Sequence, residues 1–115
     1  MVSASSLLVL SLLIPGGQEL PANGIVPPRV VKAVKADYTK EARDAHIEGT
    51  VVVEVLVSTD GMPTNVRVVE SLDSKYGLDL EAIRVSRLWR FAPATRRGQP
   101  IEQAIRLEHA FRLGR

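Results

Sequence analysis

The stretch that decides the fold is "GTVVVEVLVSTDG", residues 49–61. Every second position from 51 to 57 holds an apolar, β-branched residue: Val51, Val53, Val55 and Val57. The positions between them include Glu54 and Ser58, so the pattern has the period of two that predicts a strand with one buried face. Asp60 and Gly61 then predict a tight turn, because glycine tolerates the positive φ that such turns require.

The partner of this strand follows directly in "TNVRVVES", residues 64–71. Val66 and Val68 are predicted to face the core, while Asn65 and Arg67 face solvent. The two segments together predict an antiparallel β-hairpin.

A short helix is predicted before the hairpin, in "YTKEARDAH", residues 38–46. Thr39 is the expected N-cap, since its hydroxyl can accept a hydrogen bond from a free backbone N–H of the first turn. Ala42 and Ala45 are expected to face the core. Gly49 is expected to end this element.

A second helix is predicted in "LDLEAIRVSRLWRFAPA", residues 78–94. Asp79 is the expected N-cap, and Leu78 before it is expected to pack on Ile83 as a hydrophobic staple. One apolar stripe follows at spacings of four, three and four residues: Leu78, Ala82, Val85 and Trp89. This spacing is typical of a helix that buries one face.

The end of the second helix is predicted from Pro93, which cannot continue a helix and restricts the residue before it. We therefore expect the helix to end near Trp89 or Arg90. Trp89 and Phe91 are then expected to close the corner between this helix and the last strand.

The last strand is predicted in "IEQAIRLEHAFRL", residues 101–113. One face is expected to hold Ile101, Ile105, Leu107, His109, Phe111 and Leu113; the other is expected to hold Glu102, Arg106, Glu108 and Arg112. The order helix, strand, strand, helix, strand predicts a two-layer α+β domain with a three-stranded antiparallel sheet packed against helices. We place the last strand beside strand 49–57, with the second hairpin strand on the far edge.

This strand order leaves one long side of the last strand without a partner. Such an edge is either protected against uncontrolled pairing or used to capture an extended peptide. Arg106 and Arg112 suit the first reading, because charged side chains commonly guard edges. The pattern by itself leaves both open.

The composition gives no sign of an enzyme or of a nucleic-acid binder. The chain has no Cys, which excludes disulfides and thiolate metal sites. His46 and His109 lie in different predicted elements without a carboxylate at ligand spacing, so we expect no metal site and no cofactor. His109 is expected to be a half-buried, hydrogen-bonded residue. Neither a nucleophile elbow nor a phosphate-binding glycine loop occurs, and the outward strand positions lack the aromatic residues of an RNA-binding sheet.

Charge is distributed unevenly along the chain, although the net charge is only +2. Residues 81–115 carry eight arginines against three glutamates, and the remainder has more acids than bases. A basic C-terminal third favours an acidic partner or anionic lipid headgroups. The alternative is a solvated, arginine-rich surface.

The N-terminal segment, residues 1–22, contains an apolar run from Leu7 to Ile14. This run is too short for a membrane-spanning helix, but it fits the apolar region of a secretory signal, with Ala22 as a cleavage point. A truncated start is the alternative. Residues 23–37 show no sustained period and are predicted to be a linker and entry segment, followed by one domain at residues 38–115.

Several marks occur in a specific order along the chain: Tyr38 before a short helix, Gly49 and the valine strand, "DG" at 60–61, "LD" at 78–79, "WRFAPA" at 89–94 and "GQP" at 98–100. With these marks the chain from Pro28 to Leu113 resembles the C-terminal domain of TonB-family energy transducers. The resemblance implies a non-enzymatic domain in the periplasm of Gram-negative bacteria, which would be tethered to the inner membrane only if an anchor lies upstream. This domain would add a short box segment of an outer-membrane receptor to its last strand, during energy-coupled transport across the outer membrane.

The resemblance also implies site residues. The expected peptide-binding residues are Tyr38, with the segment before it, and Ile105, Arg106, Leu107, Glu108, His109, Ala110, Phe111 and Arg112. The expected structural residues are Gly49, Gly61, Leu78, Asp79, Trp89, Phe91 and Pro93. The expected partner is an outer-membrane receptor, joined by the proton-driven motor of the inner membrane if an anchor lies upstream. No nucleic acid is expected.

The chain departs from the family pattern at Thr39 and Ala36, where proline is usual, and at Ser86, where the second helix usually has an aliphatic residue. The alternative function is a structural or assembly module of the cell envelope. Such a module would form a homodimer by edge pairing, or contact peptidoglycan, without a transport role.

Overall fold

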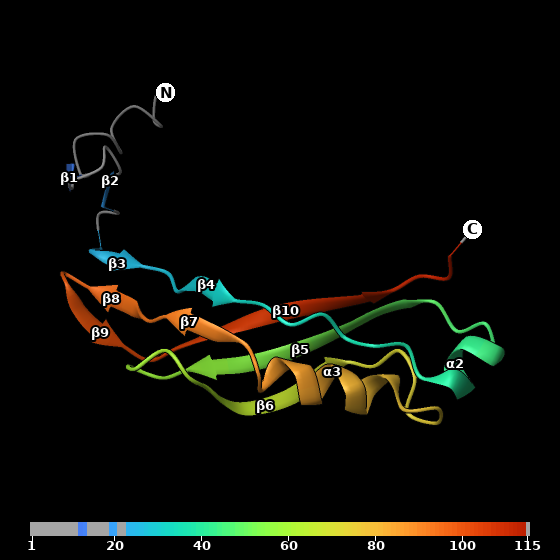
Figure 1. Cartoon of the computed structure of the whole chain (residues 1–115). Helices are drawn as coiled ribbons and strands as arrows, with labels where there is room; N and C mark the ends of the chain where they lie inside the picture. The colour runs from blue at the N-terminus through green and yellow to red at the C-terminus, as the bar shows by residue number, and fades with distance from the viewer. Residues whose placement is uncertain (1–11, 14–18, 21–22, 115) are drawn as a thin grey trace.

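The computed structural model describes residues 12–13, 19–20 and 23–114. In chain order its elements are β1 (Leu12–Leu13), β2 (Glu19–Leu20), β3 (Ile25–Val26), β4 (Arg29–Lys32), α2 (Lys40–Asp44), β5 (Gly49–Val57), β6 (Pro63–Glu70), α3 (Leu78–Ser86), β7 (Arg90–Ala92), β8 (Ala94–Arg96), β9 (Gln99–Ile101) and β10 (Gln103–Phe111). Figure 1 shows the long strands β5, β6 and β10 side by side, with α3 against them. The predicted α+β class is confirmed.

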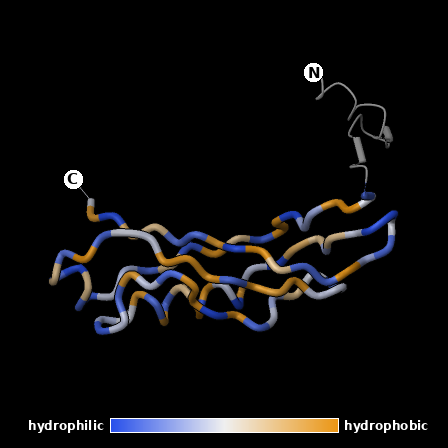
Figure 2. The backbone as a smooth tube through the Cα atoms, turned by 180° about the vertical axis from the view of Figure 1, so that it is seen from behind, coloured by the Kyte–Doolittle hydropathy of each residue, from blue (hydrophilic) through white to orange (hydrophobic). Residues whose placement is uncertain are grey.

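The main sheet has the strand order β10-β5-β6, and both pairings are antiparallel, as predicted. The four odd-numbered valines of β5 are completely buried. Leu78, Ala82 and Val85 of α3 are buried as well, and α3 contacts β5 and β6. Figure 2 shows the resulting alternation of hydrophobic and hydrophilic residues along the long strands. The core therefore lies between α3 and one face of the sheet.

The hairpin turn at Gly61 is tied to the strand that follows α3. Gly61 has a φ of 85°, and its carbonyl accepts a hydrogen bond from the N–H of Phe91 at 3.0 Å. A Cβ on Gly61 would lie 2.0 Å from the carbonyl oxygen of Phe91, so no other residue fits. Phe91 itself is buried in the core. Gly61 and Phe91, which lie 30 positions apart in separate predicted elements, thus form one corner.

The start of α3 differs from the prediction that Asp79 is its N-cap. The N-cap position is Gly77, with a φ of 97° and no side-chain cap. The carboxylate of Asp79 instead accepts hydrogen bonds from the N–H groups of Leu72 and Asp73, both at 3.0 Å. The side chain of Asp79 points back toward the loop before the helix. Its hydrogen bonds therefore fix this loop and do not cap the helix.

The residue that caps the first turn of α3 is Asp73. Its carboxylate accepts the N–H of Leu78 at 3.2 Å, as well as the N–H groups of Lys75 and Tyr76. Burial by itself would raise the pKa of Asp73, but these three backbone donors lower it overall. The helix then ends at Ser86, earlier than predicted, and Trp89 lies just beyond it.

The short helix and the last strand also differ in detail from the sequence analysis. Thr39 caps α2 as predicted, accepting the N–H of Ala42 at 3.2 Å; Ala42 is buried, whereas Ala45 is exposed. α2 ends at Asp44 with Ala45 as its C-cap, so, contrary to the prediction, Gly49 does not end this helix but opens β5. The predicted last strand is divided at Glu102 into β9 and β10.

Two short strands lie in residues 23–37, which the sequence analysis took for a linker. β3 pairs with β8, and β4 pairs with β7, all antiparallel. Their partners β7 and β8 are consecutive strands that are separated only by Pro93. The domain boundary at residue 38 stays a prediction. The predicted cleavage point at Ala22 lies outside the described residues.

Candidate functional site

The outer side of β10 is the first feature of the candidate site. β10 pairs with β5 over nine consecutive residues without a register shift, from Gln103 opposite Val57 to Phe111 opposite Gly49. Among the residues that the structure describes, no strand pairs with the other side of β10. The peptide groups of alternate residues in β10 therefore point away from the sheet.

The side chain of Arg112 indicates which residues these are. Its Nη1 donates hydrogen bonds to the carbonyl oxygens of both Gly49 and Phe111, at 2.8 and 3.1 Å. One nitrogen reaches both oxygens only if they face each other, so Phe111 and Gly49 form a hydrogen-bonded pair. By alternation the odd-numbered residues of β10 bond to β5. The backbone groups of Arg106, Glu108 and Ala110 consequently point outward.

Side chains follow the same alternation. Leu107, His109 and Phe111 are buried against the core. Arg106, Glu108 and Ala110 are exposed on the opposite face of the sheet. These three positions thus present both an exposed side chain and a free peptide group, whereas the odd-numbered residues predicted for the site hold the strand in place.

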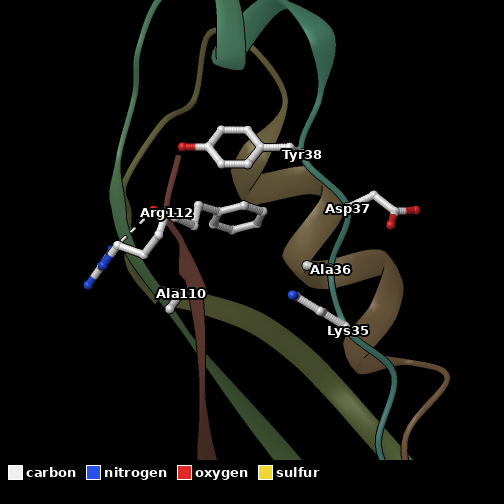
Figure 3. A pocket seen from close by; sticks show the side chains of 7 residues that line it. Lys35, Ala36, Asp37, Tyr38, Ala110 and Arg112 are labelled. Atoms are coloured by element: carbon white, nitrogen blue, oxygen red, sulfur yellow. Dashed lines mark hydrogen bonds between the residues drawn. The ribbon is translucent and has the colours of Figure 1, made fainter. Parts of the chain in front are cut away.

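A groove runs beside the C-terminal half of β10. Its other wall is the segment of residues 33–38, which connects β4 to α2. Two pockets of about 530 and 420 Å³ share Lys35, Ala36 and Ala110 and so form one continuous groove. Figure 3 shows Lys35, Ala36 and Asp37 on one side, and Ala110 and Arg112 on the other.

The 33–38 segment is fixed by hydrogen bonds from distant parts of the chain. The indole Nε1 of Trp89 donates to the carbonyl of Val34 at 2.8 Å. The N–H of Asp37 donates to Oε2 of Glu81, in α3, also at 2.8 Å. Arg84 binds the same carboxylate and, together with the Asp37 N–H, lowers the pKa of Glu81. The carboxylate therefore stays ionised and keeps the segment anchored to α3.

Tyr38 forms the end of the groove. Its hydroxyl donates to the carbonyl of Ile47, and its ring packs edge-on against Phe111 with the ring centroids 5.5 Å apart. Of the predicted residues, Tyr38 is thus brought together with Phe111, and residues 108–112 line the groove, whereas Ile105, Arg106 and Leu107 lie farther along β10. Glu81 and the Val34 carbonyl were not predicted, because a glutamate in the first turn of a helix is ordinary in sequence and a backbone oxygen carries no sequence signal.

His109 lies under this site and contacts α3. Its Nε2 is 2.7 Å from the hydroxyl of Ser86, and both residues are buried. The ring of Trp89 packs edge-on against the imidazole at 5.8 Å. Burial lowers the pKa of His109, which keeps the ring neutral near pH 7. These two buried polar residues, His109 on the apolar face of β10 and Ser86 in α3, therefore satisfy each other's hydrogen-bonding groups.

Neither a metal site nor a membrane-spanning helix is found within the described part of the chain. No cluster of three or more metal-ligating side chains occurs among residues 23–114. The described helices are all too short or too polar to cross a bilayer.

Comparison with known proteins agrees with the fold and with the marks in the sequence. The family model described as "Gram-negative bacterial TonB protein C-terminal" matches residues 34–113. This chain belongs to the TonB C-terminal family. Members of this family are interaction domains of a transducer and not enzymes. Among curated protein sequences no relative of this TonB-family chain is found.

The TonB fold is also seen in a solved structure. The solution NMR structure of the Pseudomonas aeruginosa TonB C-terminal domain superposes with a TM-score of 0.62 and 24% sequence identity. The match covers 76% of this chain and 88% of the Pseudomonas chain. At this level of identity the likeness establishes the fold alone.

Proposed function

We propose that this TonB-family domain works in the periplasm and captures an extended segment of an outer-membrane receptor as an additional strand on β10. The observation that carries the proposal is the unpaired outer side of β10, where Arg106, Glu108 and Ala110 direct free peptide groups toward solvent. Backbone hydrogen bonds supply most of the affinity in strand addition, and they need no particular side chain.

The groove supports the same proposal. An added strand beside β10 directs alternate side chains toward the space between β10 and the 33–38 segment. That wall is already held by Trp89 and Glu81 before a peptide arrives, so little ordering is needed on binding. The site residues are therefore Tyr38 and the backbone and exposed side chains of residues 105–112.

The partner follows from membership of the TonB family. A receptor segment bound on β10 would connect the outer membrane to this domain, and a proton-driven motor of the inner membrane would supply the force if an anchor lies upstream. The domain would thereby contribute to energy-coupled transport. The binding domain in this proposal consists of residues 38–115 together with the preceding residues 33–37, which form one wall of the groove.

The same free edge also suits a second function, edge pairing between two copies in an envelope assembly module. Sedimentation of the full chain at micromolar concentrations separates the two. A monomer that binds receptor peptides supports strand capture, whereas a stable dimer that blocks peptide binding supports the assembly module.

Calorimetric titration with peptides from the plug domains of outer-membrane receptors tests the main proposal. A peptide of about ten residues is compared with the same peptide carrying a central proline, which removes a backbone donor. We expect binding of the first peptide and a loss of at least tenfold in affinity for the second. Equal affinities would exclude strand addition as the mode of binding.

A further inference from the structure

A row of charges crosses the exposed face of the main sheet. Glu54 of β5 lies between Arg67 of β6 and Arg106 of β10 in the strand register. Its carboxylate is 2.6 Å from Nη2 of Arg67 and 3.9 Å from Nε of Arg106. The charges therefore alternate in sign across three strands, and the row ends with Arg106 on the free edge.

An added strand extends this row by one position. The residue opposite Arg106 lies on the same face of the sheet, with its Cβ about 4.5–5.5 Å from that of Arg106. The Arg106 side chain is 60% exposed, and the Glu54 carboxylate that it contacts at 3.9 Å is shared with Arg67. The guanidinium of Arg106 can therefore also bind a second carboxylate on its outer side. A carboxylate at this position continues the alternation, and a basic residue opposes it.

Glu108 presents the opposite charge two residues further along the same face. Its neighbour in β5 is Val52, and it forms no ion pair with any residue in the described part of the chain. Ala110, the next residue on this face, carries no charge. Along its free edge, β10 therefore displays a positive charge, a negative charge and a neutral position at intervals of two residues.

Building on strand addition at β10, we infer that the captured segment carries an acidic residue opposite Arg106 and a basic residue opposite Glu108. The two residues are separated by one position in the segment. Their order is basic then acidic if the segment runs antiparallel to β10, and acidic then basic if it runs parallel. The charge order thus selects the register, and the order that is preferred reports the direction in which the segment binds.

The test compares two peptides of identical composition in which one lysine and one aspartate, separated by one residue, exchange places. Because net charge is the same, only their order can distinguish them. One peptide places two opposite-charge pairs across the strands, and the other places two like-charge pairs. We expect the first to bind with about fivefold higher affinity. The preference should shrink at high ionic strength, since these groups are exposed.

The decisive variant is the exchange Arg106→Glu with Glu108→Arg, which keeps net charge and should invert the preference. Glu108→Arg alone disturbs no existing ion pair, and should abolish the preference even if the double variant is less stable. The exchange Arg96→Glu with Glu102→Arg, at exposed positions before β10, is the matched control and should leave the preference unchanged.

Equal affinity for the two orders, or a preference that survives the double exchange, overturns this inference while leaving strand addition intact. If the receptor peptide binds but neither ordered peptide does, the inference is also overturned. Absence of binding by every peptide, the receptor peptide included, overturns the proposed function as well.

Discussion

The hydroxyl of Ser86 and Nε2 of His109 lie 2.7 Å apart in the buried interface between α3 and β10. This hydrogen bond joins the helix layer directly to the strand with the free edge. A buried polar group without a partner costs about 1–3 kcal/mol, so each residue makes the other tolerable in an otherwise apolar core. The pair also places a titratable group beneath the candidate site.

The stability of the domain should depend on pH through His109. Burial lowers the pKa of His109 in the folded state below its unfolded value of about 6.5. The unfolded chain therefore binds more protons once the pH falls below about 6.5, and the free energy of unfolding decreases with further acidification. Above this range the ring is neutral in both states and the contribution is constant. Urea unfolding at pH 7.5 and pH 5.5 measures the difference.

The control for this pH dependence is His46→Asn, since His46 is exposed and Asn tolerates its φ of 58°. Compared with this variant and with the unaltered chain, the double variant Ser86→Val with His109→Leu should lose the part of the slope that is due to the buried ring. An unchanged slope in the double variant would assign the effect to other groups.

The same pair should be strongly coupled in a double-mutant cycle. Ser86→Val leaves the imidazole without its partner, and His109→Leu leaves the hydroxyl without its partner, so each single change should cost about 1–3 kcal/mol. The double change removes both polar groups and should cost at least about 1 kcal/mol less than the sum. Additive effects in urea unfolding would mean that the contact contributes nothing.

Trp89 should contribute through its indole N–H as well as its ring. Trp89→Phe keeps most of the packing but loses the hydrogen bond to Val34, which should cost about 1 kcal/mol. Trp89→Ala should cost about 3 kcal/mol, near the lower end of values for buried aromatics, because Trp89 is only partly buried. Exposed Arg87→Ala should change stability by less than about 0.5 kcal/mol.

Hydrogen exchange gives the second measurement for Trp89→Phe. Because the lost bond fixes one wall of the groove, the N–H groups of residues 34–38 should exchange faster, while those of β5 remain protected. Uniform acceleration over both segments would instead indicate a general loss of stability.

A proline scan of β10 should separate binding from folding. Ala110→Pro and Glu108→Pro remove N–H groups that point outward, so the fold should survive while peptide affinity falls at least tenfold. Leu107→Pro removes an N–H bonded to β5, as well as a buried side chain, and should unfold the domain. Circular dichroism and calorimetry measure the two effects.

Glu108→Ala is the matched control for the scan, because it removes the side chain and keeps the N–H. Ala104→Pro has the same backbone orientation but lies outside the groove, so its effect on affinity should be smaller. Folded proline variants with full affinity at every outward position would show that peptides bind elsewhere.

Hydrophobic periodicity made the main sheet and α3 predictable from sequence. Buried side chains recur every two residues in a strand and every three to four residues in a helix. Each pattern can therefore be recognised within a short stretch of sequence. The odd-numbered valines of β5, the stripe from Leu78 to Val85 and the alternation in β10 followed this rule. The free edge followed from the order of the elements alone.

Tertiary structure decided the parts that depend on distant partners. From the sequence, His109 stood out on the predicted apolar face of the last strand and Ser86 only as a departure from the family pattern, and the packing of α3 on β10 joins them across 23 positions. The wall of the groove depends on Asp37 meeting Glu81, 44 positions away, and on Val34 meeting Trp89, 55 positions away. Hydrogen bonds of this kind use single polar atoms that leave no periodic pattern, and the chain must be folded before their geometry exists.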